Sequence, residues 1–153
     1  MKEWFSDEKL GVFFDNTPCI GIRYATPSMT FAEIESVKKF PFINKRNLTV
    51  RLIDNIKQRT YQFDIPKGYC FDGASVPRLF WRVIGAPTDN EFLVAALVHD
   101  VLCENHQYIM NDREFSTLVF DSLLKVSEVS KVKRFFMKHS VNIFQKFFCN
   151  WGN

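Results

Sequence analysis

The sequence predicts an α+β fold, in which an N-terminal antiparallel sheet is followed by about three C-terminal helices. Two observations predict it. Short runs rich in β-branched and aromatic residues occupy the β-rich part, about residues 1–71, and apolar residues at helical spacing dominate residues 88–150. The length of 153 residues, without repeats or a low-complexity linker, predicts a single domain over residues 1–153.

Four segments in the first half have the composition of strands, and turn residues separate them. Residues 15–18 lie between the first two segments and residues 54–57 between the last two, as in β-hairpins. We therefore expect an antiparallel sheet of four or five strands. The four segments are residues 10–14 (LGVFF), 19–25 (CIGIRYA), 48–53 (LTVRLI) and 59–65 (RTYQFDI).

The second half begins with a loop and continues with helices. Residues 68–87 mix Gly, Pro and large aromatic residues without a clear period, as in a packed loop between the two halves. Each expected helix is preceded by a residue that can cap it. The helices are residues 89–104, capped by Thr88 with Glu91 in a capping box; residues 112–126, capped by Asn111; and residues 128–148, capped by Ser127.

Aromatic content and charge limit the kinds of partner. Seventeen Phe residues must be either packed inside or presented to another molecule. The net charge of +3 is too small for nucleic-acid binding by electrostatics, so nucleic acid is not an expected partner. The charge is local, because residues 131–153 carry five Lys or Arg and no Asp or Glu, which leaves −2 on residues 1–130.

The N-terminus and the cysteines indicate a reducing compartment. The start MKEWFSDEKL lacks the apolar segment of a signal peptide, and the four cysteines are too far apart for a zinc ribbon or a Cys-x-x-Cys pair. We expect free thiols in a cytosol. The longest apolar run, residues 92–98, has seven residues, whereas a bilayer requires roughly 20, so no transmembrane helix is expected.

A polar pair interrupts the helix that the sequence marks as buried. Ten of the twelve residues 92–103 are apolar, and the two polar ones are His99 and Asp100. A helix that is apolar on all sides is buried, so each polar group of this pair needs a partner. The two groups either form a satisfied hydrogen-bond network in the core or belong to a functional site.

Other acidic residues could join the pair in a functional site. Asp72 lies in the loop before the helix, and Asp112 begins the next helix, which would return alongside the first. One imidazole with two or three carboxylates serves as a general base with an orienting acid, or binds a divalent metal ion. We expect His99, Asp100, Asp72 and Arg78 as catalytic residues and His99, Asp100 and Asp112 as metal ligands.

Two neighbouring polar residues of the loop have open roles. Arg78 grips an anionic group of a ligand or pairs with a nearby carboxylate to fix the loop, and we favour the pairing. Ser75 lacks the Gly-x-Ser-x-Gly elbow of a serine hydrolase, so we expect its hydroxyl to bond a loop amide. Cys103, one turn after His99, is either a soft metal ligand or a packing residue.

Three segments carry a resemblance to a family. The stretches FDGASVPRLFWRVIGAP, AALVHDVLCEN and NDREFSTLVFDSLL resemble a family of small bacteriophage and prophage proteins, a domain of unknown function. Its pattern is Asp-x-Ala-Ser-Val-Pro-Arg, then Ala-Ala-x-x-His-Asp-x-Leu-Tyr, then Ala-Asp-x-x-Phe and a basic aromatic helix. Cys103 stands where the family has Tyr, and Asn111 where it has Ala. The matching positions are residues 72, 74–78, 95, 96, 99, 100, 102, 112 and 115.

The resemblance implies a phage-type protein in the cytoplasm of a bacterial host or in a virion. It also implies that the basic aromatic C-terminal helix could bind other phage proteins. From the residues alone, three roles are open to this basic amphipathic helix: it lies on an anionic membrane, docks on nucleic acid or covers the open face of the sheet. We expect the last. Two functions therefore remain open: a small metal- or His/Asp-dependent hydrolase, and a non-enzymatic virion component or host-interaction protein in which the His/Asp cluster is a structural network.

Overall fold

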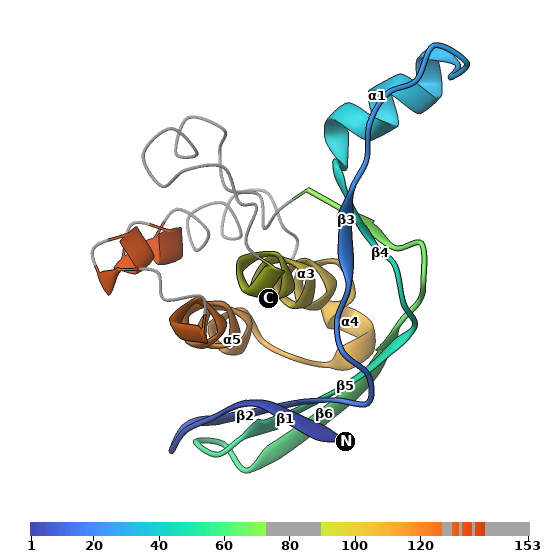
Figure 1. Cartoon of the computed structure of the whole chain (residues 1–153). Helices are drawn as coiled ribbons and strands as arrows, with labels where there is room; N and C mark the ends of the chain where they lie inside the picture. Colours follow the sequence, from blue (N-terminus) through green and yellow to red (C-terminus); the bar gives the residue numbers. More distant parts are fainter. Residues whose placement is uncertain (73–89, 127–129, 132, 136, 140–153) are drawn as a thin grey trace.

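A computed structural model describes residues 1–72, 90–126, 130–131, 133–135 and 137–139 (Figure 1). The first half of the chain forms a four-stranded antiparallel sheet with the order β1-β2-β5-β6. In β5 every second residue is buried, and in β6 the two buried residues, Tyr61 and Ile65, lie on the same face, because alternate side chains of a strand point to opposite faces. The strands are β1 (Lys2–Ser6), β2 (Leu10–Phe14), β5 (Leu48–Asp54) and β6 (Arg59–Ile65).

Three short strands form a second antiparallel sheet with the order β3-β4-β7. The predicted hairpin at residues 54–57 is confirmed, since β5 pairs with β6, but the hairpin predicted at residues 15–18 is wrong. Asp15 binds Thr49 through both its backbone N–H and its carboxylate, at 3.2 and 2.7 Å, so β5 rather than β3 lies beside β2. The strands are β3 (Ile20–Ile22), β4 (Phe42–Asn44) and β7 (Cys70–Phe71).

A helix that the sequence analysis did not predict, α1 (Phe31–Lys39), connects β3 to β4. Thr30 and Glu33 form a capping box at its start, in which each side chain accepts a hydrogen bond from the other residue's backbone N–H. This signal was present in the sequence. Figure 1 shows that α1 projects beyond the far end of β3 and β4.

The first two predicted helices of the second half are confirmed to within one residue as α3 (Asn90–Glu104) and α5 (Arg113–Val126). The short helix α4 (His106–Ile109) between them was not predicted. The cap of α5 differs from the prediction: the Asp112 carboxylate accepts the N–H of Phe115 at 2.7 Å, whereas Asn111 is buried and donates to the carbonyl of Leu102.

The last predicted helix is described in part. Residues 131, 133–135 and 137–139 are helical, and the helix begins after Ser130, whose hydroxyl accepts the N–H of Lys133 at 3.3 Å. The predicted start at residue 128 is therefore too early. The predicted caps Thr88 and Ser127 and the C-terminal Phe cluster at residues 144–148 lie outside the described residues.

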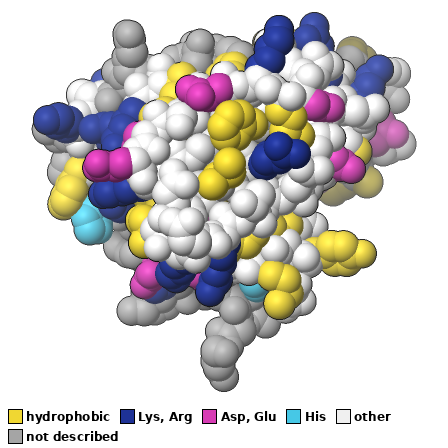
Figure 2. Space-filling view, turned by 90° about the horizontal axis from the view of Figure 1, so that it is seen from below, with side chains coloured by type: hydrophobic (Ala, Val, Ile, Leu, Met, Phe, Trp, Pro, Cys, Tyr) yellow, Lys and Arg dark blue, Asp and Glu magenta, His cyan; other side chains and the backbone are white. Residues whose placement is uncertain are grey.

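Helices α4 and α5 contact strands β6 and β1 of the four-stranded sheet, whereas α1 projects away from it. Helix α3 packs against α5, and apolar residues of both join the inner side chains of β2 and β5 in one core (Figure 1). Figure 2 looks onto the molecule from the side of this sheet, where charged side chains of both signs surround a small group of hydrophobic ones. The polar pair of α3, His99 and Asp100, is buried in this core, and His99 packs against α5.

None of the helices in the described residues combines the length and the apolar character that crossing a bilayer requires. Cys19, Cys70 and Cys103, the described cysteines, are free thiols, as expected.

The second sheet contains an aromatic contact, between Phe42 and Phe71, whose contribution to stability can be tested. Phe71 is fully buried, and its ring lies 5.6 Å from that of Phe42 across β4 and β7. We expect Phe71→Ala to reduce the free energy of unfolding by about 3–5 kcal/mol, because it leaves a cavity. Phe31→Ala is the matched control, since this side chain is 79% exposed, and its cost should stay within about 0.5 kcal/mol. Urea denaturation measures both, and a similar loss in the two variants would contradict this packing.

Candidate functional site

The centre of the candidate site is the polar pair of α3. Residues 92–98 are all buried, and the helix then places His99 and Asp100 at 2% and 5% exposure. The prediction that both side chains point into protein is therefore confirmed. An ionised group in such a place loses hydration that only nearby polar partners can replace.

His99 contacts groups from two helices. Its Nδ1 lies 3.7 Å from the nearer Asp100 oxygen, and its Nε2 lies 3.5 Å from the Cys103 sulfur. The ring of Phe120, on α5, packs against the imidazole with 4.9 Å between ring centroids. A separation of 3.7 Å is longer than a hydrogen bond, so Nδ1 and this carboxylate oxygen do not bond each other directly.

Burial determines the protonation of His99. Loss of hydration lowers the pKa of the imidazole to about 3, and the negative charge of Asp72 opposes this shift only in part. The imidazole is therefore neutral at physiological pH. A neutral imidazole can accept a proton or bind a metal ion through a ring nitrogen, whereas a protonated one can do neither.

Asp100 connects the helix to the end of the β half. Its second carboxylate oxygen accepts a hydrogen bond at 3.3 Å from the backbone N–H of Asp72, which follows β7 directly. The carboxylate thus lies between the imidazole of His99 and the chain leaving the sheet. The structure brings together three of the residues that we expected in the site: Asp72, His99 and Asp100. Arg78 and Ser75 lie outside the described residues.

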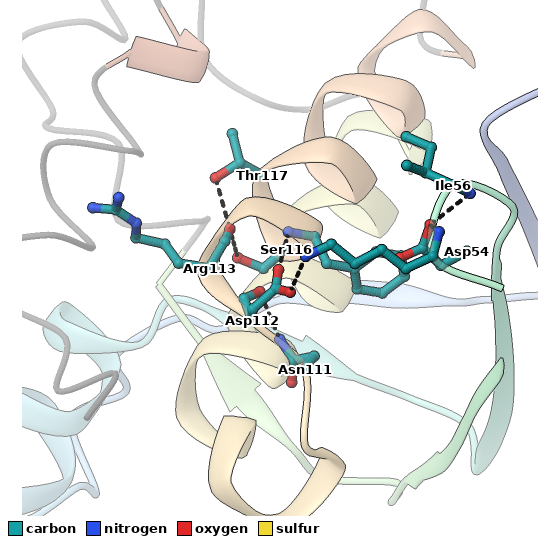
Figure 3. Close-up of polar contacts among 9 residues, drawn as sticks. Asp54, Ile56, Asn111, Asp112, Arg113, Ser116 and Thr117 are labelled. Carbon is teal, nitrogen blue, oxygen red and sulfur yellow. Dashed lines mark hydrogen bonds and ion pairs between the residues drawn. The ribbon is translucent and has the colours of Figure 1, made fainter. Parts of the chain in front are cut away.

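Asp112 is used elsewhere. It caps α5 through Phe115, and its other oxygen accepts a hydrogen bond at 2.8 Å from the Lys57 ammonium, in the turn between β5 and β6 (Figure 3). Asp54 stabilises the same turn by accepting the N–H groups of Ile56 and Lys57. Phe120, which contacts His99, comes eight residues after Asp112, a distance of about 12 Å along a helix. The structure therefore does not bring Asp112 to His99.

The Asp112 and Lys57 charges stabilise each other. Burial acts to raise the pKa of Asp112, but the hydrogen bonds from Lys57 and from the Phe115 N–H outweigh it, so the pKa is lowered. The hydrogen bond to Asp112 raises the pKa of Lys57 in turn. This ion pair joins the β5–β6 turn to the start of α5.

The described residues contain no group of three His, Cys, Asp or Glu side chains that could hold a metal ion. A metal ion on His99 and Asp100 would therefore need a further ligand from the rest of the chain or from solvent.

The sequence analysis did not predict a second polar contact near this cluster, between Tyr69, just before β7, and Glu104 at the end of α3. The hydroxyl of Tyr69 donates a hydrogen bond to the carboxylate of Glu104, which lies one turn beyond Asp100. Burial and this hydrogen bond raise the pKa of Tyr69, and the charges of Asp100 and Asp72 act in the same direction. No sequence signal joins Tyr69 to Glu104, because they are 35 residues apart and meet only through the fold.

Comparisons with known proteins bear on the same segment. A family model described as "Protein of unknown function (DUF1353)" matches residues 50–141, which include Asp72, His99, Asp100 and Asp112. The "Uncharacterized protein y4jT" of Sinorhizobium fredii is 37% identical over 51 residues, which cover 33% of this chain and 15% of that protein. This chain thus matches only a small part of the length of that relative. No solved structure matches the chain at a significant level.

The role of Asp112 as a helix cap can be tested by comparing three variants. Asp112→Ala should reduce the free energy of unfolding by about 1 kcal/mol, because the N–H of Phe115 loses its acceptor. Asp112→Ser keeps an acceptor and should cost less. Lys57→Ala removes only an exposed ion pair and should cost clearly less than Asp112→Ala. Urea denaturation measures the series, and an equal loss for Lys57→Ala and Asp112→Ala would argue against the cap.

The neutral state of His99 predicts how stability depends on pH. The pKa of its imidazole is about 3 in the folded protein and near the ordinary histidine value of 6.5 in the unfolded chain. As pH falls from 6.5 towards 3, the unfolded chain takes up a proton that the folded protein does not. This contribution to stability is therefore complete above pH 6.5 and decreases as the pH falls, by roughly 1 kcal/mol per pH unit.

Urea denaturation at pH 7 and pH 4.5 measures this effect. His99→Gln and His99→Met should both lose less stability than the wild type between the two pH values, because neither new side chain titrates. His139→Gln is the control, since His139 is exposed, and it should keep the wild-type difference. An unchanged difference in both His99 variants would refute a buried neutral imidazole.

Proposed function

Since this chain belongs to the family of proteins of unknown function DUF1353, we propose, from the site that it contains, that it is a hydrolase that depends on His99 and Asp100. In this proposal His99 is the general base and Asp100 orients it. The observation that carries the proposal is a neutral imidazole beside a buried carboxylate, 3.7 Å apart, in a helix that is otherwise apolar. Perturbed ionisable pairs of this kind are concentrated at functional sites.

The proposed chemistry begins with the neutral imidazole. His99 takes a proton from a water molecule, the hydroxide attacks the electrophilic carbon or phosphorus of the substrate, and the imidazolium returns the proton to the leaving group. The negative charge of Asp72 favours the imidazolium, and Asp100 lies against the imidazole Nδ1. The contact between a general base and its orienting acid is often longer before substrate binds than during the reaction. In this proposal the 3.7 Å between His99 Nδ1 and the Asp100 oxygen shortens to a hydrogen bond when substrate binds.

A divalent metal ion is the variant form of this proposal. His99 and Asp100 would be its ligands from α3, and a metal ion would lower the pKa of a bound water. Asp112 is omitted from the proposed site, because Lys57 and the start of α5 use its two oxygens. Arg78 stays in the proposal as a residue that binds an anionic group or fixes the loop. The phage-protein resemblance supports a phage or prophage origin, with the protein acting in a bacterial cytoplasm or on a virion.

A second candidate is a non-enzymatic protein in which the same groups are structural. The hydrogen bond from the Asp72 N–H to Asp100 favours it, because it fixes the chain after β7 against α3. A pKa of about 3 also makes His99 a weaker base than most catalytic histidines. In this candidate the protein is a virion component or a host-interaction factor.

Two conservative variants separate these functions. Asp100→Asn keeps an oxygen that can accept the Asp72 N–H but removes the negative charge beside the imidazole. A hydrolase should lose at least about 100-fold in kcat/KM in Asp100→Asn and in His99→Gln while staying folded. The substrates are p-nitrophenyl acetate, bis(p-nitrophenyl) phosphate and fluorescent casein, each with EDTA or with added Mn²⁺.

The matched controls are His139→Gln and Asp121→Asn, an exposed histidine and a half-buried aspartate outside the cluster, and both should keep wild-type activity. Because the pKa of His99 is low, activity should persist well below pH 6.5. Loss of activity with EDTA alone would favour the metal form. No activity on any substrate, with His99→Gln unfolding the protein, would favour the structural candidate.

A further inference from the structure

A groove of about 440 Å³ follows the outer edge of β6, away from the His99 cluster. Five consecutive residues of the chain, 62–66, line it, so both faces of the strand and its backbone border the groove. Tyr69, Val101 at the end of α3 and Tyr108 and Ile109 of α4 form the opposite wall. Helix α4 contacts β6. In Figure 1 it lies between α3 and the β5–β6 side of the four-stranded sheet.

The edge of β6 carries backbone groups that lack a strand partner. β6 is the last strand of its sheet, and on the opposite side of β5 the N–H and C=O of Thr49 both bond Asp15, the residue after β2. Since the backbone groups of successive strand residues face opposite sides, Val50 faces β6 and bonds its partner Phe63, and the N–H and C=O groups of Gln62 and Asp64 face away from β5. No backbone hydrogen bond outside the ladder involves Gln62 or Asp64 within the part of the chain that the structure describes. Such an edge is a template for another extended chain.

Side chains on the groove are apolar and unusually exposed. Tyr108 is 93% exposed at its rim and Met110, just after α4, is 75% exposed, while Phe63 and Ile109 are partly buried and pack on the core. Exposed aromatic and apolar side chains beside an apolar wall mark interaction surfaces in proteins. The exposure of Tyr108 and Met110 beside this apolar wall therefore indicates a binding surface.

The charges at the groove are negative. Asp64 is the one charged side chain among the described residues that line it, and Glu104 lies beside it through its hydrogen bond to Tyr69. The nearby Arg51 is engaged on the outer face of the sheet, where its Nε donates to Gln62. A bound segment with basic side chains would therefore be complementary to this edge.

We propose that the edge of β6 is a docking site for an extended segment of a partner protein, in which apolar residues alternate with Lys or Arg. The segment adds to β6 as a fifth strand and bonds the outward-facing backbone groups of Gln62 and Asp64. Its apolar side chains enter the groove beside Ile109 and Tyr69, and its basic side chains lie on the outer face beside Asp64. Five residues of strand span roughly 17 Å, which accommodates a segment of about five residues. This surface does not depend on a hydrolase activity.

A peptide array tests the proposal. The probes are six-residue peptides in which Val or Phe alternates with Lys, Glu or Ser, and fluorescence anisotropy with the full chain measures their affinities. The Lys series should bind at least about tenfold more tightly than the Glu series, and N-methylation of alternate backbone nitrogens should abolish binding. Asp64→Asn should reduce the preference for Lys over Glu by about tenfold, because it removes the negative charge at the edge.

Two tyrosine variants provide the matched control. Tyr108→Ala should weaken binding at least about tenfold, and Tyr24→Ala, an exposed tyrosine at 72% outside the groove, should not change it. Equal binding of the Lys and Glu series, no binding by any series, or no effect of Tyr108→Ala would overturn the proposal. Sedimentation that finds a dimer which Tyr108→Ala dissociates would also overturn it, because the occupant would then be a second copy of this chain.

Discussion

The carboxylate of Asp100 is the group on which the arrangement of the two halves depends. It is buried in a helix that is otherwise apolar, where an unpaired charge would cost several kcal/mol, roughly 3–5. Its partners come from both halves: the N–H of Asp72, at the end of the second sheet, and the imidazole of His99 on its own helix. The hydrogen bond that this carboxylate accepts from Asp72 holds the chain that leaves β7 against α3.

The same helix connects the buried pair to the surface. Glu104, one turn beyond Asp100, accepts the hydroxyl of Tyr69, and Tyr69 also lines the groove along β6. Glu104 and Asp100 of α3 thus bind the chain on either side of β7, at Tyr69 before it and at Asp72 after it.

The fold was predictable wherever a local pattern decided it, and it was not where pairing decided it. The strand alternation of residues 48–65 and the apolar periodicity of residues 92–104 are local, and both gave elements with nearly the observed bounds. The partner of β2 was not local: Asp15 binds Thr49, 34 residues away, so the chain leaves the first sheet instead of turning back. Helix α1 had a local signal in Thr30 and Glu33, which the surrounding β-rich composition obscured.

The sequence by itself determined that His99 and Asp100 are buried, because ten apolar neighbours in twelve residues leave a helix no exposed face. It also indicated Asp72 as a member of the cluster. Only the tertiary structure decided that Asp112 pairs with Lys57, and that β6 has a free edge beside α4. The physical reason is that burial follows from composition along one helix, whereas contacts between helix ends, turns and strand edges depend on how separate elements pack.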